Sequence, residues 1–195
     1  MQSRLPLCLT LLALLTCAAA DKKLPDGKAL LPADTLKAAR RHVGPKPSGE
    51  MKTVDVEGQP FKQAIRAVVK ETPENPWTVQ VSTLTVADAK EGDVVLASFW
   101  ARCAGTKAAD GKAQFLVYFG IPESDLDHAM AQELSIGPKW TRVQVPARVP
   151  ADFASGKAML NLDLGYAAQT VELADIKLTN YGKTVKLEDL PSSGF

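Results

Sequence analysis

The chain has 195 residues, of which 46% are hydrophobic and 23% are charged, and its 23 basic side chains nearly cancel its 22 acidic ones. Such a balance argues against DNA or another polyanion as the partner, because nucleic-acid binding calls for a basic excess or a basic stripe. Neutral ligands remain, and neutral polysaccharides are among them.

The first twenty residues have the pattern of a secretory signal peptide. Arg4 supplies a basic start, residues 5–15 an apolar run, and residues 18–20 a small-residue end. The run is too short and wrongly flanked for a transmembrane helix. We expect cleavage after Ala20 and a secreted or periplasmic product, while Cys17 matches the pattern of a lipidated cysteine only weakly.

Residues 21–52 are predicted to form a lead-in segment. They are rich in Lys, Pro, Gly and Ala, with one short helical possibility at 33–41 that the Gly and Pro residues of 44–49 end. The remaining residues, 53–195, are expected to form a single β-sandwich domain with its own core. Cys103 is the only cysteine beyond the leader, so no intramolecular disulfide is expected.

From residue 53 onward apolar residues recur with period two, and turn residues follow at intervals of about ten. The pattern predicts strands at 61–70, 77–82, 94–102, 113–119, 131–136, 140–145, 158–164 and 170–179, with a helical alternative at 125–133. Short strands without intervening helices indicate antiparallel sheets. The predicted fold is therefore all-β, a two-sheet antiparallel jelly-roll sandwich.

The strand within residues 92–103 carries the strongest indication of function. Alternate residues from Val95 to Cys103 form a core row, which makes Cys103 a buried structural thiol, while Ser98, Trp100 and Arg102 share the other face. An exposed Trp can stack on a sugar ring while Arg hydrogen-bonds its hydroxyls. Alternatively, a second sheet or a loop covers Trp100.

Four segments together resemble the jelly-roll carbohydrate-binding modules of families four, nine and twenty-two, which accompany bacterial xylanases and cellulases. They are Asn75 to Val81, Gly92 to Arg102, Lys139 to Val143 and Gln169 to Leu178, and the resemblance spans roughly residues 53 to 182. It implies a galactose-binding-like sandwich with a glycan cleft.

On this resemblance the ligand-binding residues are Trp100, Arg102, Gln80, Tyr118, Gln169 and Glu172. Trp77 shares a row with Val79 and Val81 and is interpreted as core, and Trp140, at a strand start, as structural. Many members of these families hold a structural Ca²⁺, and Asp175 matches one of its ligands. The apolar phase shifts at Asp175, so a bulge there could turn its carboxylate toward an ion, although an ordinary surface Asp is equally consistent.

The motifs of several enzyme classes do not occur. The two histidines and the cysteines lack zinc spacing, and no Gly-x-Ser-x-Gly elbow is present. Glu133 and Glu172 are the least implausible pair for glycoside hydrolysis. We therefore interpret the chain as a non-catalytic xylan- or glucan-type polysaccharide-binding module that assists a secreted glycoside hydrolase. The alternatives are an adhesive sandwich that binds a protein at the cell surface and, less favoured, a hydrolase.

Overall fold

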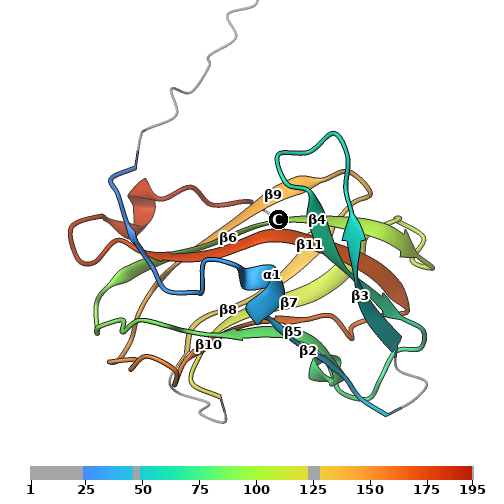
Figure 1. The fold of residues 1–195 in the computed structure, drawn as a ribbon, viewed down its shortest axis with the longest axis horizontal. Helices are drawn as coiled ribbons and strands as arrows, with labels where there is room; N and C mark the ends of the chain where they lie inside the picture. Colours follow the sequence, from blue (N-terminus) through green and yellow to red (C-terminus); the bar gives the residue numbers. More distant parts are fainter. Residues whose placement is uncertain (1–23, 46–48, 123–127, 195) are drawn as a thin grey trace, which may run out of the picture.

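A computed structural model describes residues 24–45, 49–122 and 128–194. Two antiparallel sheets pack face to face over these residues (Figure 1). The predicted signal peptide lies outside the described residues. No helix among those described is long and apolar enough to cross a membrane.

The six-stranded sheet has the order β3-β4-β11-β6-β9, with β1 paired to β11. Its strands are β1 (Lys28–Ala29), β3 (Gly49–Asp55), β4 (Gln63–Val69), β6 (Val94–Thr106), β9 (Thr141–Arg148) and β11 (Gln169–Asn180). The five-stranded sheet has the order β2-β5-β10-β7-β8. It contains β2 (Arg40–Val43), β5 (Val79–Leu84), β7 (Ala113–Gly120), β8 (His128–Ile136) and β10 (Met159–Asp163). This arrangement confirms the predicted jelly-roll sandwich.

The main core lies between the sheets and takes the alternate residues of each strand. Phe99 of β6 and Phe115 of β7, for example, contact each other across it with ring centroids 6.2 Å apart. Cys103 is buried on this core side, as predicted, and burial raises the pKa of its thiol. A buried thiol with a raised pKa is a packing residue rather than a nucleophile.

Three of the predicted segments need correction. Residues 28–43 belong to the sandwich, because β1 pairs with β11 and β2 pairs with β5. The expected helix at 33–41 shortens to α1 (Thr35–Ala38), which Asp34 caps by accepting a hydrogen bond from the backbone N–H of Lys37. Within 125–133 the described residues are strand β8 rather than helix, since alternate residues such as Met130 fill the core.

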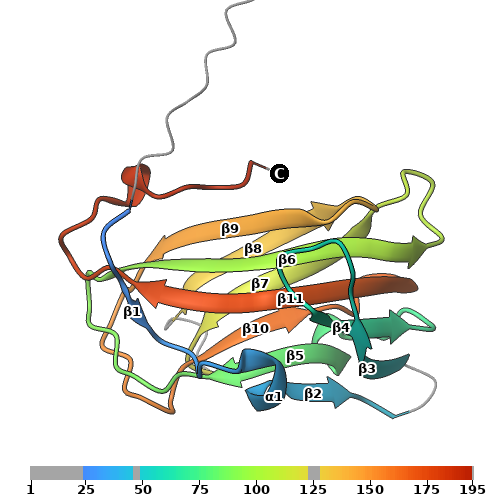
Figure 2. The ribbon, with the colours of Figure 1, turned by 45° about the horizontal axis from the view of Figure 1, so that its top comes forward.

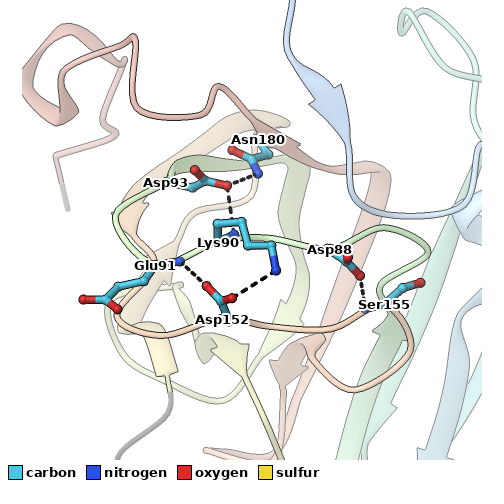
Figure 3. Close-up of polar contacts among 7 residues, drawn as sticks. All are labelled: Asp88, Lys90, Glu91, Asp93, Asp152, Ser155 and Asn180. Carbon is cyan, nitrogen blue, oxygen red and sulfur yellow. Dashed lines mark hydrogen bonds and ion pairs between the residues drawn. The ribbon is translucent and has the colours of Figure 1, made fainter.

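Asp93, just before β6, and Asp152 link the loop before β6 to the end of β11 and to the loop after β9 (Figure 3). The buried Asp93 carboxylate accepts hydrogen bonds from the backbone N–H of Lys90 at 2.9 Å and from the Asn180 side chain, at the end of β11, at 2.7 Å. Asp152, in the loop after β9, accepts from the backbone N–H of Glu91 and pairs with Lys90 at 3.0 Å. The motif that marks the resemblance thus has a structural role.

Candidate functional site

Three of the sequence-predicted ligand residues lie together on the outer face of the six-stranded sheet. Glu172 of β11 is fully buried and lies between two arginines. Its Oε1 is 2.5 Å from Nη2 and 2.6 Å from Nε of Arg66, and its Oε2 is 2.6 Å from Nε of Arg102. Arg102 in turn lies over the Trp140 ring, 4.9 Å from its centroid. Both carboxylate oxygens of Glu172 are therefore already paired within the protein.

Trp100 lies beside this ion-pair cluster and is half-buried beneath the loop between β3 and β4. Phe61 of that loop contacts both Trp100, at a centroid distance of 5.9 Å, and Trp140, at 4.9 Å with the rings edge to face. Val56 of the same loop packs against Ala64 and Ala174 in the same apolar cluster. The loop visibly crosses β6 and β11 in Figure 2. A loop thus covers Trp100, as the second interpretation of its strand expected.

The C-terminal segment covers another part of the same face. Val185 and Leu190 pack on Val94 and Leu96, which point outward from β6. Further along, the backbone N–H of Ser193 donates to Gln144 of β9 at 2.9 Å, so the segment follows the β9 edge (Figure 2). The two smaller apolar clusters of the described chain both lie on this face. Self-packing therefore leaves little of it for a ligand.

Gln169 belongs to neither outer face, which corrects its predicted outward position. It is 3% exposed, and its side-chain amide donates to the backbone carbonyls of Gln114 and Leu164 while its oxygen accepts from the backbone N–H of Gln114. Strand alternation places it in the row of Val171, on the core side. Gln169 thus ties β11 of one sheet to β7 of the other.

The outer face of the five-stranded sheet carries polar side chains in two rows that cross the strands. Cross-strand pairing defines the first row as His42, Gln80, Asp163, Leu116 and Glu133. The second row is Arg40, Ser82, Asn161, Tyr118 and Ala131. Gln80 and Tyr118, which the sequence predicts as ligand-binding residues, therefore lie on one polar surface. The same surface also contains His42, Asn161, Asp163 and Glu133.

Asp163 of the central strand β10 has a carboxyl group whose surroundings shift its pKa. It is 7% exposed, and burial raises the pKa of its carboxyl above the usual 3.8, while the side-chain amide of Gln80 donates to it at 2.7 Å and offsets part of the shift. Burial also raises the pKa of Tyr166, with Glu133 and Asp163 adding to the shift. A buried carboxylate with one protein donor can accept further hydrogen bonds from a ligand.

The predicted core position of Trp77 is wrong, because its side chain is 57% exposed. The strand begins only at Val79, because residues Pro76–Thr78 form a 3₁₀ helix that takes Trp77 out of the strand alternation. The backbone N–H of Gly165 donates to Pro76, which holds the segment before β5 against the one after β10. Trp77 therefore stands near the Gln80 and Asp163 end of the polar face.

Hollows lie at opposite corners of the polar face. One, of about 160 Å³, is lined by Gln114, Glu133, Ser135 and Tyr166. The other, of about 320 Å³, lies beside Arg40 and Ser82. Between them Tyr118 is half-buried, its hydroxyl donates to the Ile121 carbonyl at 3.1 Å, and its ring lies 5.7 Å from that of His128. Tyr118 thus lies within the polar face on β7, beside the central strand β10, and the exposed Trp77 belongs to the segment just before β5.

The sequence reasoning missed Asn161 and Asp163, although a signal for both was present. They alternate with Leu160 and Leu162 in the strand predicted at 158–164. Two buried leucines with polar residues between them indicate a strand that has one polar face. Glu133 and Glu172, the pair that the sequence makes least implausible for glycoside hydrolysis, lie on different sheets, so their carboxylates cannot flank one glycosidic bond.

Asp175 lies at the bulge that the sequence predicted, because the pairing of β11 with β6 shifts between Ala174 and Lys177. Its φ of +49° is in the left-handed region, which Asp tolerates better than most residues. Its carboxylate pairs with the ammonium of Lys177 at 2.7 Å. Among the described residues no group of three His, Cys, Asp or Glu side chains could hold a metal ion. Asp175 thus has a lysine as its partner and no pair of acidic side chains beside it among the described residues, and calcium binding there stays an expectation of the resemblance.

Comparison with solved structures places the architecture among known folds. The second N-terminal cellulose-binding domain of Cellulomonas fimi β-1,4-glucanase C superposes with a TM-score of 0.58 at 16% identity, over 80% of this chain and 96% of that one. The fold is that of the jelly-roll carbohydrate-binding modules. No family model matches the chain, and no curated protein matches it either.

Two further structures share the same fold. A carbohydrate-binding module of family four superposes with a TM-score of 0.53 at 14% identity, over 73% of this chain and 86% of that one. The CBM22-1 xylan-binding domain of Paenibacillus barcinonensis Xyn10C gives 0.51 at 12% identity, over 81% and 97%. These matches confirm the expected resemblance at the level of the fold.

Proposed function

We propose that the protein is a non-catalytic polysaccharide-binding module whose ligand lies on the outer face of the five-stranded sheet. The observation that carries this proposal is the contrast between the two outer faces. The chain's own loops pack on the six-stranded sheet, whereas the outer face of the five-stranded sheet carries the half-buried Gln80 and Tyr118 beside the nearly buried Asn161 and Asp163, with the exposed Trp77 just before β5. Apolar rings beside converging polar groups suit a sugar chain.

Each group has a role that follows from its position. Trp77 offers an indole face for stacking on a pyranose ring, because more than half of its surface is open. Asp163 accepts from sugar hydroxyls, and Gln80, held by Asp163, donates and accepts beside it. A site of this kind is expected to bind in the micromolar to millimolar range, about −4 to −8 kcal/mol.

Weak binding is useful when it keeps a partner close to its substrate. The structures that share the fold are described as cellulose-binding and xylan-binding domains. We therefore propose a xylan- or glucan-type ligand and an exported product that assists a secreted glycoside hydrolase. The export depends on the leader predicted at residues 1–20.

Two variants that each remove one indole test the location of the site. Trp77→Ala should abolish retardation in affinity electrophoresis against xylan, β-glucan and mannan for whichever polymer retards the wild type. Trp100→Phe, on the other sheet, should be retarded like the wild type, because Phe keeps an apolar ring beneath Phe61. The reverse result would return the ligand to the six-stranded sheet.

Fluorescence gives an independent readout. In the double variant Trp100→Phe, Trp140→Phe the only remaining indole is that of Trp77, so saturating polysaccharide should change its emission directly. Emission that does not change while electrophoresis still reports binding would exclude Trp77 from the contact. If no polysaccharide retards the wild type at all, a protein partner becomes the better hypothesis.

A further inference from the structure

A pocket of about 320 Å³ opens at one corner of the polar face. It lies where the C-terminal end of β5 and the N-terminal end of β10 meet β2 and the segment around α1. Its walls include Arg40, Ser82, Leu84, Thr85, Val86 and Met159. Leu84 and Val86 are about half exposed, at 49% and 56%. The volume is at the lower end of the range for small-molecule sites, so it suits one sugar-sized group rather than a length of chain.

The pocket is lined mainly by apolar side-chain surface and by one positively charged side chain. Arg40 is the only ionisable residue among the described residues that line it. The guanidinium of Arg40 is exposed, and within the described ranges it has neither an ion pair nor a hydrogen bond. Thr85, 3% exposed, has a hydroxyl oxygen with no partner among the described groups. An unpaired guanidinium beside leucine, valine and methionine favours a ligand that joins a carboxylate to an apolar surface.

The pocket is continuous with the proposed polysaccharide site. Arg40 pairs with Ser82, Ser82 with Asn161, and Asn161 with Tyr118, so one row leads from the centre of the face to the pocket. Neighbouring strands lie about 4.8 Å apart, which puts Arg40 roughly 14 Å from Tyr118. A sugar chain that lies along this row therefore brings a branch on its terminal residues over the pocket.

We propose that this pocket binds a uronic acid branch of the polysaccharide, with the branch carboxylate on Arg40 and its ring against Leu84 and Met159. The inference rests on the proposed function, since the main chain must first lie on the polar face. A neutral acyl group would fill the apolar wall but leave Arg40 unpaired, and a free inorganic anion would not use that wall. A uronic acid uses both features.

Calorimetric titration with two matched polymers tests the proposal on the full protein. The first is a glucuronoxylan, and the second is the same polymer after carboxyl reduction, which keeps the main chain and the branch but removes the charge. The wild type should bind the uronate form about three- to fivefold more tightly, the effect of one partly exposed ion pair. Added salt should reduce this preference because it screens an exposed pair.

Three variants separate the pocket from general charge effects. Arg40→Gln should bind both polymers equally, with the affinity that the wild type has for the reduced polymer. Leu84→Asp should also remove the preference, because a fixed carboxylate then competes for Arg40. Lys70→Gln removes one exposed cation next to β4 of the other sheet and should keep the wild-type preference.

Failure of this inference and failure of the proposed function give different results. Equal binding of both polymers by the wild type overturns the uronic acid pocket and leaves the polysaccharide site in place. A preference that Lys70→Gln weakens as much as Arg40→Gln also overturns it, because net charge would then explain the effect. Absence of binding to either polymer overturns the proposed function itself.

Discussion

Removal of the Glu172 carboxylate should separate the stability of the fold from ligand binding. Glu172 is fully buried, and its oxygens make three contacts of 2.5 to 2.6 Å with Arg66 and Arg102. Deletion of one partner of a buried ion pair typically costs about 3 to 5 kcal/mol. Here the arginines are 36% and 34% exposed, so water can rehydrate them in part. We expect Glu172→Ala to lower the free energy of unfolding by about 2 to 3 kcal/mol.

A loss of that size should leave the protein folded, because domains are stable by about 5 to 15 kcal/mol. The corresponding fall in Tm is roughly 5 to 10 °C for a domain of this length. Urea unfolding followed by circular dichroism and by tryptophan fluorescence measures the change, and Glu172→Gln should fall between the wild type and Glu172→Ala. Below the Tm, Glu172→Ala should keep its affinity for polysaccharide, since Glu172 lies on the covered sheet.

Glu50→Ala is the matched control. It removes a carboxylate from an exposed pair, Glu50 and Lys70 at 4.0 Å and 56% exposed each, and should cost less than about 0.5 kcal/mol. If Glu172→Ala costs no more than this control, the argument from the buried cluster is wrong. If Glu172→Ala stays folded but loses the polysaccharide, the ligand lies on the six-stranded sheet.

Three further predictions follow from single carboxyl groups. The pKa of Asp163 is raised above 3.8 by burial, so its ionisation destabilises the fold as pH rises through that raised pKa. Asp163→Asn, which keeps an acceptor for Gln80, should therefore have a Tm advantage over the wild type that grows from pH 4 to pH 7; a constant difference contradicts this. Asp175→Val should cost roughly 1 to 2 kcal/mol because of its φ of +49°, and Asp175→Gly much less; equal losses would contradict the strain. Because the Asp175 carboxylate is already paired with Lys177, we expect EDTA to leave the Tm unchanged, against the calcium site that the resemblance implies; a Tm that EDTA lowers in the wild type but not in Asp175→Asn would place calcium on Asp175.

The sequence predicted the architecture well because strand alternation is a local property. The core row of residues 95–103, the bulge at Asp175 and the buried Cys103 all follow from which residues alternate. Residues 28–43 were harder to place, since β2 has only four residues and pairs with a strand about forty positions later. Short edge strands carry little periodic signal of their own.

The sequence predicts which residues of the candidate site point outward, but it does not predict which of them remain uncovered. Alternation separates an outward residue from a core residue, but it does not say whether another part of the chain covers the outward one. Trp100 points outward as predicted, yet Phe61 of the β3–β4 loop lies on it. The sequence pattern places Trp77 in a core row, yet Trp77 lies in the 3₁₀ helix Pro76–Thr78, and the strand begins only at Val79. Both outcomes depend on segments whose position the strand pattern does not encode.

The distribution of polar groups over the two faces gives a consistent physical account. On the six-stranded sheet the charged groups satisfy one another, as Glu172 does with its two arginines, and the aromatic rings pack together. On the five-stranded sheet Asn161 keeps a side-chain oxygen without a partner among the described residues, and Asp163 remains ionisable in a buried position. Incompletely paired polar groups reduce stability, and functional sites are where such costs tend to persist. The two sheets therefore differ in polar pairing: the six-stranded sheet satisfies its charged groups internally, and the five-stranded sheet keeps incompletely paired ones, which is the contrast on which the proposed binding face rests.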